Sequence, residues 1–215
     1  MSATRAVAFD FNGTLSHDEP ILCAVYREMF SARGRPLSAE DYYGTLAGLA
    51  EEAIIGTWLD IEGEALAALV EERIDRYLEL SGDGATVPQT LREAVAYAAD
   101  RVPVAVVSGA FRREIEPVLV GARLDQYVEV IVAAEDVERG KPDPAGYARA
   151  LELLDRGLLP SEVVAFEDTE AGVASAKAAG LRCVAVLGTH PAERLRVADE
   201  IVDAIDVELV QRLLG

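Results

Sequence analysis

Five short runs of apolar residues, separated by stretches with helical spacing, constrain the fold of this chain more than any other feature. The runs are continuous rather than alternating, which is typical of parallel strands that helices cover on both faces. They span Ala6–Phe9, Val102–Val107, Val128–Val132, Val163–Phe166 and Cys183–Leu187. From about residue 86 onward, strand-like and helical patterns alternate. This alternation predicts an α/β fold with a doubly wound parallel sheet.

One long helical stretch interrupts the alternation after the first strand. About seventy residues pass before the second strand, and apolar residues recur in them at helical spacing, as in Ile21, Val25 and Met29. Ser38 is a candidate helix N-cap, and the glycine-rich turn at residues 81–84 marks the return to the sheet. Residues 16–85 are therefore expected to form an all-helical insertion. Because ligands of open α/β sheets bind at the carboxyl ends of the strands, the insertion should cover that site as a lid.

The charge balance excludes several classes of partner. The formal net charge is −18 over 215 residues, so nucleic acid and anionic membrane surfaces are poor partners. The two cysteines, Cys23 and Cys183, are expected to be reduced and buried. The N-terminus shows no signal-peptide pattern and no apolar run is long enough to span a bilayer. We therefore expect a cytoplasmic protein. Its expected oligomeric state is a monomer or a homodimer.

Two short motifs follow the first and second strands. Asp10-Phe11-Asn12-Gly13-Thr14 comes directly after the first run and directs a carboxylate toward the expected crevice, although an Asn-Gly turn after a strand is common. Ser108-Gly109 closes the second run, where a hydroxyl and a free backbone N–H suit a phosphate oxygen. Taken alone, Ser108 is better explained as the N-cap of a helix.

A lysine and an acidic pair follow further along the chain. Lys141, one of only two lysines, lies between a glycine and a proline, where it is equally well explained as an anion-binding charge or as an exposed loop residue. Glu167 and Asp168 end the fourth run. Adjacent acids at a buried strand end repel each other unless a cation lies between them, whereas a helix N-terminus alone explains Asp168 better than Glu167. Thr169 is suited to cap the next helix.

Together the motifs indicate one site. Asp10, Ser108, Lys141 and the acidic pair each follow a successive strand-like run, so all of them should meet in one crevice. Carboxylate oxygens in that number suit Mg²⁺, which prefers carboxylates together with substrate phosphate.

These motifs resemble the four signature motifs of the haloacid dehalogenase superfamily, and the resemblance covers the whole chain. The insertion resembles the helical cap of the branch that includes β-phosphoglucomutase, phosphoglycolate phosphatase and haloacid dehalogenases. The run from Glu167 to Gly172, with Ala176 and Ala179-Gly180, is similar to the fourth motif of that branch. The resemblance implies a Rossmann-like core of residues 1–15 and 86–215 and a cap of residues 16–85. It also implies a Mg²⁺-dependent phosphatase that hydrolyses a small phosphorylated metabolite through an aspartyl-phosphate on Asp10.

The resemblance assigns a role to each motif residue. Asp10 would be the nucleophile and a metal ligand, Asn12 a metal ligand through its backbone carbonyl, and Glu167 and Asp168 would complete the metal site.

The remaining motif residues would act on the phosphoryl group. Ser108, the Gly109 N–H and Lys141 would bind its oxygens, and Thr14 would steady the loop at the same phosphate site. Lys141 together with Mg²⁺ would supply the charge that phosphoryl transfer requires.

Asn12 departs from the family pattern. Family phosphatases have a second Asp there, which protonates the leaving oxygen and then activates water. An amide donates a hydrogen bond but transfers no proton at neutral pH, and positioned acid–base catalysis contributes about 10²- to 10⁴-fold. His17 is a candidate substitute acid, although an exposed loop histidine explains it better.

Four interpretations of Asn12 remain open. In the first, the chain is a phosphatase that is slow or that uses substrates whose leaving group needs little protonation. In the second, it is a family member with another chemistry, and in the third, a weakly active or non-catalytic relative that binds phosphate or has a regulatory role. In the fourth, Asn12 is an introduced change. Glu167 and Asp168 argue against a dehalogenase, and the absence of lysine from residues 15–140 argues against a phosphonate hydrolase. A sugar-phosphate mutase is disfavoured because it needs the missing acid–base group at both steps. We rank the phosphatase first and the phosphate-binding relative second.

Substrate identity depends on the insertion, whose signals are weak. Tyr42, Tyr43, Gly48-Leu49, Glu51 and Trp58 fall where cap loops of similar enzymes face the site. Aromatic and leucine side chains in such positions more often belong to the core of the cap.

Overall fold

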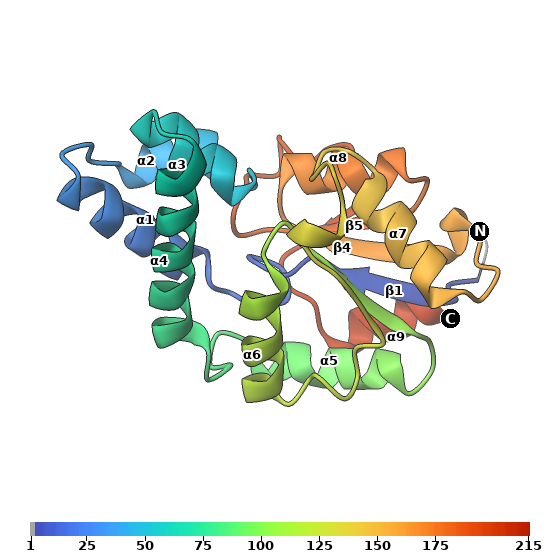
Figure 1. The fold of residues 1–215 in the computed structure, drawn as a ribbon. Coiled ribbons are helices and arrows are strands. Elements are labelled where there is room, and N and C mark those ends of the chain that lie inside the picture. Colours follow the sequence, from blue (N-terminus) through green and yellow to red (C-terminus); the bar gives the residue numbers. More distant parts are fainter. Residues whose placement is uncertain (1–2) are drawn as a thin grey trace.

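A six-stranded sheet forms the centre of the computed structural model, which describes residues 3–215 (Figure 1). All neighbouring strands pair in parallel, in the order β3-β2-β1-β4-β5-β6. The strands are β1 (Ala6–Phe9), β2 (Val104–Val107), β3 (Val130–Val132), β4 (Val163–Glu167), β5 (Arg182–Val186) and β6 (Glu200–Val202). The predicted doubly wound α/β fold is confirmed.

Each of the five predicted runs contains a strand, and the bounds of β1 are those predicted. Strand β2 begins at Val104, two residues later than expected, directly after Pro103, which has no N–H to donate to a neighbouring strand. The sequence pattern missed β6, because this edge strand has only three residues and its side chains are only partly buried.

Helices cover both faces of the sheet. Helices α5 (Gln89–Ala99), α6 (Arg112–Ala122) and α9 (Val207–Leu214) lie on one face, and α7 (Ala145–Leu154) and α8 (Glu170–Ala178) lie on the other (Figure 1). Successive residues of a strand point to opposite faces, so Val7 and Phe9 pack in the first layer. The second layer receives mainly small side chains: Ala6, Ala8, Ala105, Ala165 and Ala185. Small side chains there allow α7 and α8 to pack close to the sheet.

The segment between β1 and α5 is helical, as predicted. It contains α1 (Glu19–Ala32), α2 (Ala39–Asp41), the π-helical turn η1 (Tyr42–Leu46), α3 (Glu51–Leu59) and α4 (Gly63–Ser81). We refer to residues 19–81 as the helical insert. It lies to one side of the sheet, at the end where β1 leads into α1 (Figure 1). The predicted cap residue Ser38 accepts a hydrogen bond from the backbone N–H of Asp41.

A buried ion pair joins the helical insert to the core. Arg73 of α4 is fully buried and donates to both carboxylate oxygens of Glu114 in α6, with the Nη2–Oε2 bond at 3.0 Å. Arg73 also pairs with Glu51 at the start of α3. Because a buried charge without a partner is strongly unfavourable, this group of three charges fixes how α3 and α4 lie against α6.

Both cysteines are free and buried, as predicted. Within residues 3–215, no helix combines the length and the apolar character that crossing a bilayer requires.

Candidate active site

The candidate site lies where the strand order reverses direction. Strands β1 and β4 are neighbours at the centre of the sheet, and the chain winds outward from them in opposite directions. Phe9 pairs with Phe166, and the N–H of Asp10 donates to the Phe166 carbonyl at 2.9 Å. Asp10 and Glu167 therefore leave the sheet side by side at its carboxyl edge. This is the position at which doubly wound sheets bind their ligands.

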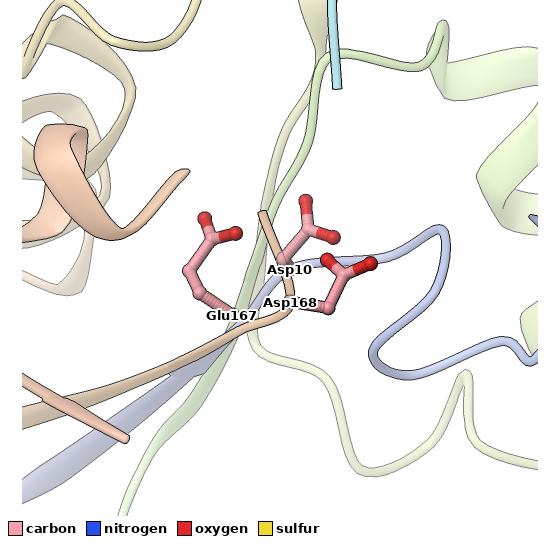
Figure 2. Close-up of side chains that lie close together, drawn as sticks. All are labelled: Asp10, Glu167 and Asp168. Carbon is pink, nitrogen blue, oxygen red and sulfur yellow. The ribbon is translucent and has the colours of Figure 1, made fainter. Parts of the chain in front are cut away.

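Three carboxylates meet at this point. Asp10, Glu167 and Asp168 each have an oxygen within 4.8 Å of the others, and all three residues are buried. Figure 2 shows the three side chains projecting from the ends of their two strands into the same space. The structure thus brings together the three side chains that the sequence assigned to one cation.

Burial raises the pKa of two acids in this cluster, Glu167 and Asp168. It raises the pKa of Asp168 well above its ordinary value, and the nearby carboxylates of Asp10, Glu19 and Glu167 raise it further. Burial also raises the pKa of Glu167, to about 7, although the ammonium of Lys141 opposes the change. Ionised carboxylates so close together in the interior need a cation to balance their repulsion.

The donor set fits a divalent cation. Oε2 of Glu167 and Oδ2 of Asp168 are buried and have no hydrogen-bond partner within the part of the chain that the structure describes. A buried polar atom without a partner is unfavourable unless a further group binds it. All the candidate ligands are oxygens, which is the ligand type that Mg²⁺ prefers.

Lys141 lies inside the cluster. Its side chain is 12 % exposed, and its ammonium pairs with Asp10 and, at 2.6 Å, with Oε1 of Glu167. Burial disfavours its charge, but the two carboxylates prevail and raise the pKa of Lys141 above its ordinary value. The interpretation as an exposed loop residue is therefore wrong. Tyr147, which the sequence gave no reason to select, donates to the same Glu167 oxygen at 2.5 Å.

Ser108 and Gly109 line the cavity above Asp10. The Ser108 hydroxyl accepts a hydrogen bond from the Ala110 N–H at 3.1 Å. The N-cap alternative for Ser108 is wrong, because α6 begins at Arg112 and Phe111 is its N-cap. A hydroxyl and a free N–H at the cavity wall remain suited to a phosphoryl oxygen.

Thr14 supports the acidic cluster from behind. Its side chain is fully buried and its hydroxyl donates to Oδ1 of Asp168 at 3.1 Å. Thr14 is not among the residues that line the cavity, so the structure places it next to a candidate metal ligand and away from the predicted phosphate contact. Thr169 caps α8 as expected, since its hydroxyl accepts from the Gly172 N–H at 3.1 Å.

Two glycines leave room for the carboxylates. A Cβ at Gly13 would collide with the carboxylate of Asp168, and Gly13 also has a φ of +76°, a conformation that other residues rarely adopt. A Cβ at Gly172 would collide with the carboxylate of Glu167. Both positions require glycine because the acids occupy the space that a side chain would need.

Asn12 is held by a network that the sequence did not predict. Its amide donates to Oδ2 of Asp18 at 2.9 Å, and the Gly13 N–H donates to the other oxygen of Asp18 at 3.2 Å. Tyr77 of α4 also donates to Asp18. Asp18 is fully buried, and burial raises its pKa to about 6. The network ties the loop after β1 to the helical insert.

The helical insert supplies one wall of the cavity. The sequence predicted that several residues of the insert face the site. Four of them line the cavity: Tyr42, Gly48, Leu49 and Glu51. Glu19 also lines the cavity, although no sequence motif indicated it.

Three other candidates lie elsewhere. Tyr43 and Trp58 do not line the cavity, and the Trp58 ring stacks on Phe30 within the insert. His17 is exposed and also lies outside the cavity lining, so its position favours the interpretation as a surface residue.

Comparisons with known proteins agree with this geometry. A family model described as haloacid dehalogenase-like hydrolase matches residues 4–180. Validoxylamine A 7'-phosphate phosphatase of Streptomyces hygroscopicus subsp. limoneus is 32 % identical over 200 residues, covering 92 % of each chain. Phosphoglycolate phosphatase of Pectobacterium atrosepticum is 32 % identical over 190 residues, covering 86 % of this chain and 80 % of its own. A mutant of CbbY from Rhodobacter sphaeroides, solved in complex with xylulose-(1,5)bisphosphate, superposes with a TM-score of 0.83 at 27 % identity and covers 96 % of each chain.

Replacing Gly172 with alanine tests the packing of Glu167. In an ordinary helix this change stabilises by about 0.5–1 kcal/mol, but here the added Cβ meets a buried carboxylate, so we expect a loss of about 1–3 kcal/mol. Urea unfolding measures the difference. Gly44→Ala is the matched control, because a Cβ there meets nothing within 4 Å, and it should not destabilise. Equal stability of the two variants would contradict the assigned packing.

Proposed function

Because this chain belongs to the haloacid dehalogenase-like hydrolase family, we propose that it is a phosphatase that hydrolyses the phosphate monoester of a small metabolite through an aspartyl-phosphate on Asp10. Relatives of similar length are phosphatases, which supports this class of reaction. The observation that carries the proposal is the meeting of Asp10 with Lys141 at the wall of one cavity, with two further buried acids, Glu167 and Asp168, next to them.

The reaction proceeds in two displacements. A carboxylate oxygen of Asp10 attacks phosphorus, the bond from phosphorus to the ester oxygen breaks, and the alcohol leaves with a proton from the surrounding medium. Water then attacks phosphorus, the acyl phosphate bond breaks, and inorganic phosphate leaves while the carboxylate of Asp10 is restored. Dividing the reaction in this way replaces one difficult step with two easier ones.

Charge on the transferred phosphoryl group must be balanced. The ammonium of Lys141 lies next to Asp10, and Ser108 and the Gly109 N–H face the same cavity, so these groups bind and orient the phosphoryl oxygens. Asp10, Glu167 and Asp168, with the backbone carbonyl of Asn12, would hold Mg²⁺. The ion would add positive charge next to the phosphoryl oxygens.

Asn12 limits the rate of this reaction. Its amide binds Asp18 and has no proton to transfer, so the leaving oxygen receives no general acid from this position. The phosphatase should therefore favour esters whose leaving group needs little protonation. The same feature supports the second candidate function, a phosphate-binding or regulatory relative with little or no turnover.

Turnover of p-nitrophenyl phosphate with Mg²⁺ tests the proposed activity. We expect steady hydrolysis that chelation with EDTA abolishes and added Mg²⁺ restores. Asp10→Asn should lower kcat by at least about 10³-fold, because the nucleophile is lost. The matched control is Asp75→Asn, since Asp75 is exposed on α4, and it should retain the parent rate. Metal-independent turnover, or unchanged turnover of Asp10→Asn, would exclude the proposed mechanism; absence of any turnover would leave the phosphate-binding relative.

Asn12→Asp tests the account of the missing acid. The introduced carboxyl group should raise kcat on an alkyl phosphate by about 10²-fold or more, because it protonates a poor leaving group. The gain on p-nitrophenyl phosphate should be smaller, since p-nitrophenolate leaves without protonation. Steady-state kinetics on both esters measures the two gains. An unchanged rate on the alkyl ester would show that the residue at position 12 does not limit catalysis.

A further inference from the structure

The cavity has two walls of different chemistry. The core wall carries the phosphate-directed groups around Asp10 and Lys141. The wall from the helical insert is apolar and acidic: Glu19, Leu22, Tyr26, Tyr42, Leu49, Glu51 and Ile54. A substrate that places its phosphoryl group against the core wall must present its organic part to the insert wall.

Positive charge is confined to the core wall. Among the cavity-lining residues of segment 3–215, Lys141 is the only basic side chain, and it already pairs with Asp10 and Glu167. The insert wall has two acids, Glu19 and Glu51. Burial raises the pKa of Glu19 to about 8, which leaves Glu51 as the charged acid of this wall at neutral pH. A second anionic group on the substrate would therefore find no cation opposite it.

Glu51 has an acceptor available for the ligand. The residue is only 9 % exposed, and one of its oxygens pairs with Arg73. Its other oxygen, Oε2, is buried and has no hydrogen-bond partner in the described part of the chain. A buried carboxylate oxygen without a donor is unfavourable, so a donor from the ligand would be favourable there.

Arg73 does not change the sign of this wall. It is fully buried and is shared between the carboxylates of Glu51 and Glu114, so the three groups together carry one formal negative charge. Its guanidinium is not part of the cavity lining.

An adjoining hollow offers no alternative for an anion. It shares Glu51 and Lys141 with the main cavity and adds Glu52, Glu135, Glu138 and Arg139. The Arg139 side chain is 80 % exposed, where solvent weakens its attraction. A larger substrate that extended into this hollow would meet three further acids and one solvated cation.

We propose that the substrate is a phosphate monoester whose organic part carries no anionic group and presents a hydroxyl or ammonium donor to Glu51. This inference rests on the proposed function for the placement of the phosphoryl group. A carboxylate or a second phosphate on the substrate would face like charge in a partly desolvated cavity, which disfavours binding.

Three six-carbon phosphates of similar size test the proposal: glucosamine 6-phosphate, glucose 6-phosphate and 6-phosphogluconate. Calorimetry with Mg²⁺ on the Asp10→Asn variant measures binding without turnover, at a pH where the amine of the first ligand is protonated. We expect the amine to bind at least as tightly as the neutral sugar, and 6-phosphogluconate to bind at least about tenfold more weakly than either. Binding of the carboxylated compound as tightly as the others, or binding of none of the three, would overturn the proposal.

Turnover by the unmodified chain separates this inference from the proposed function. If the order of binding holds but none of the three ligands nor p-nitrophenyl phosphate is hydrolysed, the substrate preference stands and the phosphatase activity fails. If all three are hydrolysed with equal kcat/KM and bound equally, the activity stands and the preference fails.

Glu51→Gln, introduced together with Asp10→Asn, locates the effect. The glutamine keeps an oxygen for Arg73 but removes the negative charge, so the preference for glucosamine 6-phosphate over 6-phosphogluconate should fall at least threefold, on the order of one lost charge–charge contact. Glu64→Gln is the matched control, because Glu64 is exposed in the first turn of α4, and it should keep the preference. Equal preference in the two variants would exclude Glu51 as the cause. If the glutamine variant does not fold, the binding order on Asp10→Asn still decides the proposal.

Discussion

Repulsion among three buried carboxylates is the constraint on which this site depends. Asp10, Glu167 and Asp168 approach within 4.8 Å of one another in the protein interior, where the carboxylates of Asp10 and Glu167 add to the burial that raises the pKa of Asp168. Lys141 supplies one positive charge, yet an oxygen of Glu167 and one of Asp168 remain without a partner among the described residues. A divalent cation would balance the remaining negative charge and bind the unpaired oxygens. The same cation would bring phosphate to a protein whose net charge of −18 otherwise repels it.

The surrounding structure holds these groups in place. The parallel register of β1 and β4 fixes the backbone of Asp10 next to Glu167, and Tyr147 and Thr14 each bind one of the acids. On the opposite side, the insert contacts the loop after β1 through Tyr77 and Asp18. The core and the insert are therefore linked through hydrogen bonds and a buried ion pair. In the proposed function, the core wall would bind the phosphoryl group of the substrate and the insert wall would contact its organic part.

The sequence predicted the parts of the structure that depend on regular patterns. Continuous apolar runs located five strands. Because parallel strands end at one edge of a sheet, the motifs at their ends were expected to meet. The structure brings together four of the motif residues: Asp10, Lys141, Glu167 and Asp168. Edge strand β6 was too short for a pattern. Asp18 and Tyr147 were not predictable, since their roles arise from side chains that approach across long sequence separations. Thr14 shows the same limit: its motif marks its importance, but only the fold shows that it binds Asp168.

The central claim is that one divalent cation binds between these three carboxylates. Crystals grown or soaked with Mn²⁺ in place of Mg²⁺ test it directly, because anomalous scattering locates manganese independently of the surrounding protein. The account predicts one strong anomalous peak between Asp10, Glu167 and Asp168, within coordination distance of their oxygens, which disappears when Asp168→Ala crystals are treated identically. No peak at this position under saturating Mn²⁺, or a peak that persists in Asp168→Ala, would contradict the account.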